Sequence, residues 1–306
     1  MRGGAAGAPA LAVETVTAGQ GDSEKSISAV LAHGLLGRGR NMLTFARDLA
    51  RSLSAQRSNA HVSVHLPDLP NHGASPRFAP SIDESAEQLA GLVSQTKSSL
   101  LIGHSLGGKL ALYAAGSDWI RQRVEQVWAL DCFPGRLTYD LHGTSTTMSQ
   151  LEQLLDIEGC IHSRHEAKAK MEQLGLSLRL REWVASNLVP DASNSSGSPD
   201  GPMRFVFCLE ACKQIYESYC NTDLWSVLEG ADDKDTERCR FPHPAVHFLR
   251  AERTIEHWRA EDEQRLANIA CSSNPKAAQV HTLENAGHWV HVERPQELRR
   301  IILDSQ

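Results

Sequence analysis

Short apolar runs alternate with helical patterns along most of the chain. Apolar runs bounded by turn formers predict buried strands, and apolar residues spaced three and four apart predict amphipathic helices. The expected strands lie at residues 11–17 (an edge strand), 28–32, 61–67, 100–102, 126–130, 245–249 and 280–283. The expected helices of this part lie at residues 41–54, after Ser81, from Lys109, at 253–270 and at 295–303. This alternation predicts an α/β fold with a mostly parallel central sheet covered by helices on both faces.

The pattern changes in the middle of the chain, where helices follow one another without strands. They are expected at residues 147–156, 162–174, 177–187 and 205–219, with a Ser/Gly/Pro-rich loop at 191–202. We interpret residues 141–240 as a helical lid inserted into a core formed by residues 1–140 and 241–306. Such a lid walls off a substrate pocket and excludes water. Apolar lid side chains are expected to pack the lid, and some to line an acyl pocket: Phe205, Phe207, Leu209, Ile215 and Tyr216.

A serine between two glycines follows the strand that ends at Ile102. The segment Gly103-His-Ser-Leu-Gly107 matches G-x-S-x-G, and a helix-forming segment begins at Lys109. Strand, sharp turn and helix are the context of a nucleophile elbow. A serine on so tight a turn is strained, so the positions two before and two after it must be nearly free of side chains. We therefore predict that Ser105 is a nucleophile.

An oxyanion-binding loop is expected upstream of this serine. The strand at residues 28–32 runs directly into His33-Gly-Leu-Leu-Gly37. A loop in this place can aim a backbone N–H at the developing oxyanion, together with the N–H that follows the nucleophile. We predict that the N–H groups of Leu35 and Leu106 form this oxyanion hole and that His33 braces the loop. The alternative is a plain strand-to-helix connection.

A nucleophilic serine needs a base, and the base needs a carboxylate that fixes its tautomer. His288 comes after the last strand and before the terminal helix, which is the position of the base in this chain order. The loop after the strand at 245–249 commonly carries the acid, and it offers Glu252 and Glu256 but no aspartate. Asp131 directly follows another strand, where a buried carboxylate needs a partner. We therefore predict Asp131 as the acid, with the two glutamates as alternatives.

Composition narrows the possible functions. The 306 residues carry a formal net charge of −6, and the chain has no basic run typical of nucleic-acid binding. No apolar run approaches the ~18 residues of a membrane span. Seven cysteines without C-x-x-C pairs favour a reducing compartment inside the cell, cytoplasmic or organellar, with mitochondrion and plastid both open. The Gly/Ala-rich segment 1–12 is expected to be an unstructured start. No dinucleotide, phosphate-loop or metal-ligand spacing is present, so no cofactor and no metal are expected.

These motifs together resemble the α/β-hydrolase superfamily. Within it they resemble the lid-bearing esterase branch that includes bacterial acyl-CoA esterase-type enzymes and abhydrolase-domain-11 proteins. The segments that carry the resemblance are 33–37, Asp68-Leu-Pro-Asn-His-Gly-Ala-Ser-Pro76, 103–108, Leu130-Asp-Cys-Phe-Pro134 and Gly287-His-Trp-Val-His291. In that branch the acid comes from the L-D-x-x-P position, which implies Asp131. Two departures are Pro70, where the branch usually has Arg, and Glu252-Arg253 in place of a Gly-Asn-Ser-type turn.

The resulting hypothesis is a serine hydrolase of small to medium acyl esters or thioesters, acting through a Ser-His-Asp triad and an acyl-enzyme. Its expected partner is the small-molecule acyl ester or thioester substrate, and neither a nucleic-acid partner nor a membrane span is expected. One alternative is a perhydrolase, lactonase or C–C hydrolase with the same triad. Another is a ligand-binding receptor on a hydrolase scaffold that catalyses nothing.

Overall fold

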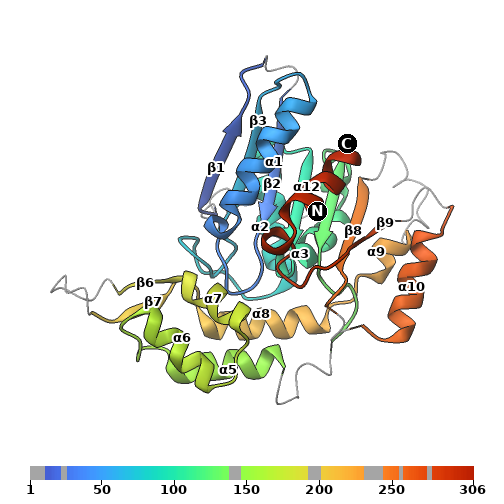
Figure 1. Ribbon diagram of the computed structural model, residues 1–306. Helices are drawn as coiled ribbons and strands as arrows, with labels where there is room; N and C mark the ends of the chain where they lie inside the picture. The colour runs from blue at the N-terminus through green and yellow to red at the C-terminus, as the bar shows by residue number, and fades with distance from the viewer. Residues whose placement is uncertain are drawn as a thin grey trace.

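The computed structural model describes residues 11–21, 26–137, 146–191, 201–230, 244–254, 258–273 and 278–306. Most of the segment expected to be an unstructured start, and most of the Ser/Gly/Pro-rich loop, lie outside these ranges. The described chain is built on a seven-stranded sheet of order β1-β3-β2-β4-β5-β8-β9 (Figure 1). Its strands are β1 (Val13–Ala18), β2 (Ile27–Ala32), β3 (Val62–Pro67), β4 (Leu100–His104), β5 (Gln126–Leu130), β8 (Ala245–Ala251) and β9 (Gln279–Leu283). Only β1, at the edge, pairs antiparallel; the other pairings are parallel.

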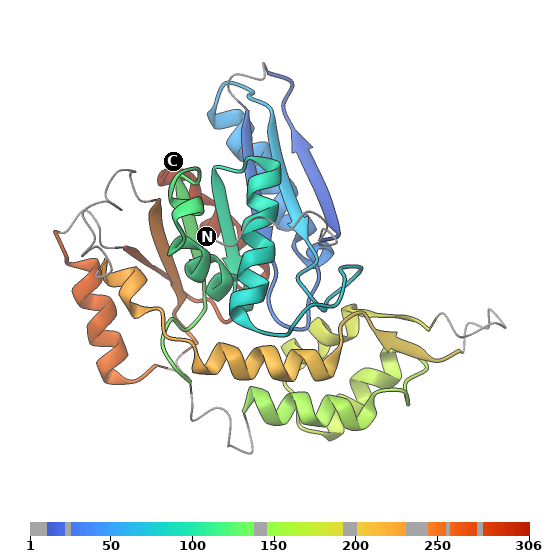
Figure 2. The same ribbon diagram turned by 180° about the vertical axis from the view of Figure 1, so that it is seen from behind.

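Helices cover both faces of this sheet because successive strand residues point to opposite sides. In β2, Ala29 and Leu31 pack into one core, and Val30 and Ala32 pack into the other. Helices α1 and α12 cover the first face, whereas α2, α3 and α10 contribute to the second core (Figure 2). The helices of the core are α1 (Leu43–Gln56), α2 (Ile82–Thr96), α3 (Leu106–Ala115), α4 (Asp118–Arg121), α10 (Ala260–Ala270), α11 (Val290–Glu293) and α12 (Pro295–Asp304), with a short 3-10 turn at Gly39–Met42. The predicted fold class is confirmed.

A second layer of helices lies beneath the carboxyl ends of the strands, between β5 and β8 in the sequence (Figure 1). Its elements are α5 (Thr147–Ile157), α6 (Arg164–Gln173), α7 (Leu178–Ser186), β6 (Leu188–Pro190), β7 (Met203–Phe205), α8 (Leu209–Asn221) and α9 (Trp225–Glu229). The expectation that this block has no strands is wrong, since β6 and β7 form an antiparallel hairpin. Phe205 lies in β7, and the helix begins only at Leu209. Apolar and polar residues alternate through Met203-Arg-Phe205, which suits a strand rather than the first turn of a helix.

The helix expected at residues 253–270 is also shorter than predicted, because α10 begins at Ala260. Residues 252–254 form a turn that is held by specific hydrogen bonds. The Glu252 N–H donates to the carbonyl of Leu283 at 3.1 Å, and the Arg253 N–H donates to the carbonyl of Ala286 at 2.9 Å. These bonds fix the backbone in a non-helical conformation beside the end of β9.

Strand register brings three chain segments to one edge of the sheet. His104 pairs with Leu130 between β4 and β5, and Leu130 pairs with Leu249 between β5 and β8. The residues that follow these strands therefore meet at the edge that faces the second layer of helices, as ligand sites do in open parallel sheets.

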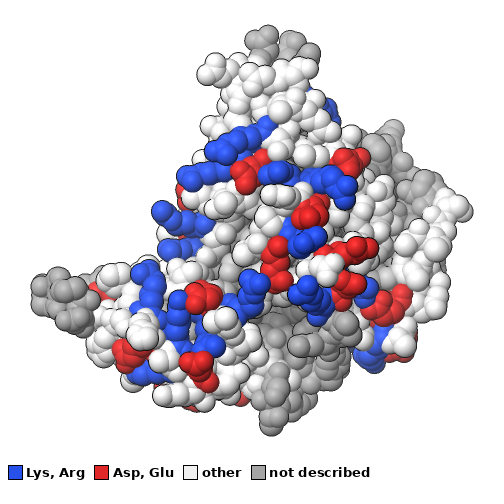
Figure 3. Space-filling view, viewed as in Figure 1, with Lys and Arg blue, Asp and Glu red and all other residues white. Residues whose placement is uncertain are grey.

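The molecular surface carries both signs of charge. On the face shown in Figure 3, Lys and Arg side chains lie among Asp and Glu side chains over both layers. In the part of the chain that the structure describes, no helix combines the length and apolar character that crossing a bilayer requires.

Candidate active site

Ser105 occupies a strained turn between β4 and α3. Its φ of 53° and ψ of −113° are unusual for a residue with a side chain. The neighbouring backbone leaves no room for side chains on either side. A Cβ on Gly103 would lie 2.0 Å from the carbonyl oxygen of Gly107, and a Cβ on Gly107 would lie 2.7 Å from that of Ala32. The two glycines of G-x-S-x-G are thus required sterically, as the sequence predicts.

The predicted oxyanion loop lies directly against this turn. A Cβ on Gly34 would be 3.2 Å from the Cβ of Ser105, so the two backbones approach closely. Leu35 and Leu106 both line the pocket that contains Ser105. Leu106 is the first residue of α3, where backbone N–H groups point out of the helix end and can bind a negative charge.

Two buried histidines brace the oxyanion loop. His33 Nδ1 donates to the carbonyl of Gly34 at 2.7 Å, and its Nε2 accepts from the N–H of Leu69 at 2.9 Å. His72 Nε2 accepts from the N–H of Leu36 at 3.3 Å, and its Nδ1 donates to the carbonyl of Pro70. Burial, aided by the neighbouring His72, holds the pKa of His33 well below its usual range. Burial also lowers the pKa of His72 to about 4. Both rings are therefore neutral and can accept these bonds.

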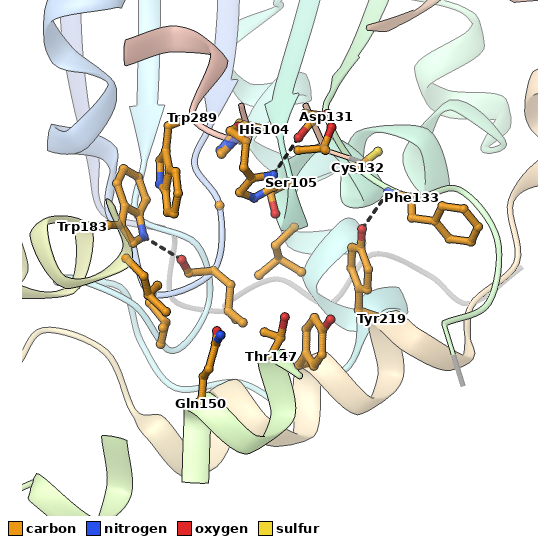
Figure 4. Close-up of a pocket in the computed structure, with 18 of the residues that line it drawn as sticks. His104, Ser105, Asp131, Cys132, Phe133, Thr147, Gln150, Trp183, Tyr219 and Trp289 are labelled. Carbon is orange, nitrogen blue, oxygen red and sulfur yellow. Dashed lines mark hydrogen bonds and ion pairs between the residues drawn. The ribbon is translucent and has the colours of Figure 1, made fainter. Parts of the chain in front are cut away.

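Asp131 follows β5 and is surrounded by donors. Its Oδ2 lies 2.7 Å from Nδ1 of His288 (the dashed line at Asp131 in Figure 4). Its Oδ1 accepts from the N–H of Ala251 at 2.9 Å and from the hydroxyl of Thr254 at 2.8 Å. The Asp131 side chain is 3% exposed, so these bonds replace the water that the carboxylate loses. Such a carboxylate can fix the Nδ1–H tautomer of His288 and leave Nε2 as the proton acceptor.

The alternative acids are placed differently. The carboxylate of Glu252 accepts from the N–H of Asn285 at 2.7 Å on the exposed side of its loop, and Glu252 does not line the pocket. Glu256 lies outside the described residues. The structure therefore brings together Ser105, Asp131 and His288 in one pocket.

Apolar and aromatic side chains from both layers line this pocket together with the polar groups of the site, and its volume is about 350 Å³. The apolar and aromatic residues are Leu35, Leu36, Leu106, Phe133, Leu137, Leu151, Leu180, Trp183, Tyr216, Tyr219, Trp258 and Trp289. Of the five lid residues proposed for an acyl pocket, only Tyr216 lines it; Phe205, Phe207, Leu209 and Ile215 belong to the buried core. Among the described residues, no group of three or more His, Cys, Asp or Glu is arranged to hold a metal ion.

The sequence analysis did not identify two residues of this region, Thr254 and Lys109. The Thr254 hydroxyl donates a hydrogen bond to Asp131. The only signal for Thr254 in the sequence is its position shortly after the end of β8. Lys109 is fully buried in α3; its Nζ donates to the carbonyls of Gly135 at 2.8 Å and Tyr219 at 2.7 Å. Lys109 is the one charged residue in the otherwise apolar helix α3, and this pattern could have drawn attention to it.

Comparison with known proteins decides the family. A model described as the alpha/beta hydrolase family matches residues 29–301. The chain belongs to the α/β hydrolase family. The sequence prediction of this family is thereby confirmed, and the helical block between β5 and β8 is an insertion into its fold.

Relatives within the family are hydrolases. The chain is 26% identical over 278 residues to esterase YbfF of Escherichia coli, covering 89% of this chain and 90% of that protein. It is 25% identical over 272 residues to the sn-1-specific diacylglycerol lipase ABHD11 of Xenopus tropicalis, covering 87% of this chain and 73% of that protein. A solved marine microorganism esterase superposes with a TM-score of 0.70 at 21% identity, covering 96% of this chain and 99% of that chain, which shows the shared fold.

Proposed function

We propose that this protein is a serine hydrolase that cleaves carboxylic esters or thioesters of small to medium acyl groups through an acyl-enzyme. The observation that carries the proposal is the 2.7 Å contact between Asp131 Oδ2 and His288 Nδ1, in the pocket that also holds Ser105 on its strained turn. Similarity to the esterase and the lipase supports an acyl ester as the substrate class.

The reaction follows from these roles. His288 Nε2 takes the proton of Ser105 while Oγ attacks the acyl carbonyl, and Asp131 stabilises the imidazolium that forms. The N–H groups of Leu35 and Leu106 bind the oxyanion of the tetrahedral intermediate. His288 then gives the proton to the departing alcohol or thiol, which leaves the acyl group on Ser105. A water molecule, deprotonated by His288, then attacks the acyl carbon. The bond between this carbon and Ser105 Oγ breaks, Oγ takes the proton back from His288, and the acid is released.

The second helical layer acts in this proposal as the lid. We take it to span residues 141–240, between core parts 1–140 and 241–306. Leu151 and Tyr216 line the pocket from this layer, and Ser105 lines it from the core. An apolar cover of this kind excludes water and strengthens the interactions that stabilise the oxyanion. The cavity of about 350 Å³ lies at the small end of the range for ligand pockets, which favours small to medium acyl groups.

Hydrolysis of p-nitrophenyl esters over a series of acyl lengths tests the proposal. We expect turnover by the wild type, and loss of kcat by a factor of about 10³ or more in Ser105→Ala. The matched control is Ser94→Ala on α2, which should keep wild-type kcat. A fluorophosphonate should label the wild type on the peptide that contains Ser105. A wild type that is inert towards every ester and unlabelled would overturn the proposal.

A further inference from the structure

Most polar side chains in the pocket are already committed to partners within the protein. The Trp183 indole donates to the carbonyl of Leu35 at 2.9 Å, and the Tyr219 hydroxyl accepts from the N–H of Phe133 at 2.9 Å (both dashed in Figure 4). Ser177 caps α7, where its hydroxyl accepts from the N–H of Leu180. These hydrogen bonds hold the walls of the pocket in place, so the same groups have fewer hydrogen-bonding positions left for a substrate.

Gln150 is different. It lies on α5, and its side chain extends into the pocket on the side opposite Ser105 (Figure 4). The residue is half-buried, and its backbone N–H donates to the carbonyl of Thr146. Its carboxamide makes no hydrogen bond to any part of the chain that the structure describes. A group that can donate and accept therefore faces the substrate space with both capacities unused.

The residues around Gln150 determine how its free carboxamide affects the binding of different acyl chains. Leu151, Leu180 and Trp183 line the same pocket and offer mainly apolar surface, and Thr147 lies beside Gln150 on α5 (Figure 4). A purely hydrocarbon chain would displace water from the carboxamide and leave it unpaired, which is unfavourable. A chain with a polar group in the right place would restore the hydrogen bond and still bury its methylene groups.

In the proposed reaction we place the acyl group of the substrate on the lid side of the pocket. His288 must give its proton to the leaving group, and its side chain is 38% exposed, so a leaving group placed beside this ring has access to solvent. The acyl chain then extends beneath the lid, where α5 presents Gln150.

We propose that Gln150 determines acyl specificity and that the preferred substrates carry a neutral hydrogen-bonding group, such as a carbonyl, hydroxyl or amide, on the acyl chain. This inference rests on the proposed ester hydrolysis. It adds that the pocket selects a polar substituent within an otherwise apolar chain.

The test compares p-nitrophenyl 4-oxopentanoate, 5-oxohexanoate and 6-oxoheptanoate with the pentanoate, hexanoate and heptanoate. The measured quantity is the ratio of kcat/KM for each oxo ester to that for its unsubstituted partner. We expect this ratio, at the best oxo position, to be about five- to tenfold higher in the wild type than in Gln150→Leu. Differences in intrinsic ester reactivity cancel because both enzymes act on the same esters. Part of this change should come from a higher kcat/KM of the Gln150→Leu variant for the unsubstituted ester.

Two further variants sharpen this test. Gln153→Leu makes the same substitution on the same helix outside the pocket, and it should keep the wild-type ratio. Gln150→Asn retracts the carboxamide by one methylene, so the best oxo position should move one carbon further from the ester. This variant also separates recognition from a folding defect in Gln150→Leu.

The outcomes are distinct. Equal ratios in the wild type and Gln150→Leu, with the unsubstituted esters turned over, would overturn the specificity proposal and leave ester hydrolysis intact. A wild type inactive on all six esters and on the shorter acyl series would overturn ester hydrolysis itself, and the specificity proposal with it.

Discussion

His104 Nε2 donates a hydrogen bond to the backbone carbonyl of His288 at 2.7 Å, across 184 positions of sequence. Burial, reinforced by His288 and His291, holds the pKa of His104 well below its usual range, so the ring is neutral. Its other nitrogen faces Gly34, where a Cβ would lie 3.0 Å from Nδ1. The residue next to the nucleophile thus links the nucleophile turn to the loop of the proposed base and to the oxyanion loop.

Replacement of Asp131 should show whether this residue, and not one of the alternative glutamates, is the acid of the triad. In Asp131→Asn an amide replaces the carboxylate that accepts from His288 Nδ1, so the tautomer is no longer fixed. We expect kcat to fall by a factor of about 10³ to 10⁴ with the fold intact. Glu252→Gln is the control and should keep kcat within a factor of about two, since its carboxylate bonds a loop N–H instead. Retention of activity in Asp131→Asn would show that another carboxylate acts as the acid of the triad.

Thr254 should act on turnover through Asp131. Thr254→Val removes the 2.8 Å hydrogen bond to Oδ1 and keeps the shape of the side chain. A hydrogen bond to a charged group contributes about 1.5–3 kcal/mol, which corresponds to a loss in kcat of roughly tenfold or more if the bond orients the carboxylate. Thr254→Ser should restore most of kcat because it keeps the hydroxyl. A fall in stability with kcat unchanged would show that the bond serves the fold alone.

Lys109 should make stability depend on pH in the alkaline range. Burial lowers its pKa to about 8 from 10.5, against the opposing influence of the Cys132 and Cys220 thiols. Between these values the unfolded chain holds a proton that the folded protein has lost, so the free energy of unfolding rises with pH.

We expect the difference in unfolding free energy between wild type and Lys109→Met to grow in favour of the wild type by up to ~1.4 kcal/mol per pH unit. Urea titrations at pH 7, 8, 9 and 10 measure it, and effects of other groups cancel in the difference. A difference independent of pH would contradict the depressed pKa.

The glycines of the nucleophile turn should be intolerant of any side chain. A Cβ on Gly103 would lie 2.0 Å from a backbone oxygen, so Gly103→Ala must displace the turn that carries Ser105. We expect loss of activity and destabilisation of roughly 3 kcal/mol or more. Gly91→Ala on α2 is the matched control, because nothing lies within 4 Å of its Cβ. It should stabilise the protein by about 0.5–1 kcal/mol in thermal unfolding.

The sequence by itself determined the features that depend on neighbouring residues. The nucleophile turn is encoded within Gly103–Gly107, because the steric demands of a strained serine are met by glycines two positions away on either side. Alternation of strands and helices predicted the sheet and its helical cover, since side-chain periodicity decides which face of each element is buried. Helix capping was equally local: the hydroxyl of Ser81 accepts from the N–H of Glu84 at the start of α2.

Only the tertiary structure decided what depends on loops that meet at the edge of the sheet. The contact of Asp131 with His288 requires the register of β5, β8 and β9; the sequence favoured Asp131 but kept the glutamates of the neighbouring loop as alternatives. The hairpin β6–β7 and the exposure of Gln150 to the pocket likewise follow from packing between the two layers. Hydrogen bonds between residues far apart in the chain depend on distances that no local pattern encodes, and these bonds orient the proposed catalytic groups.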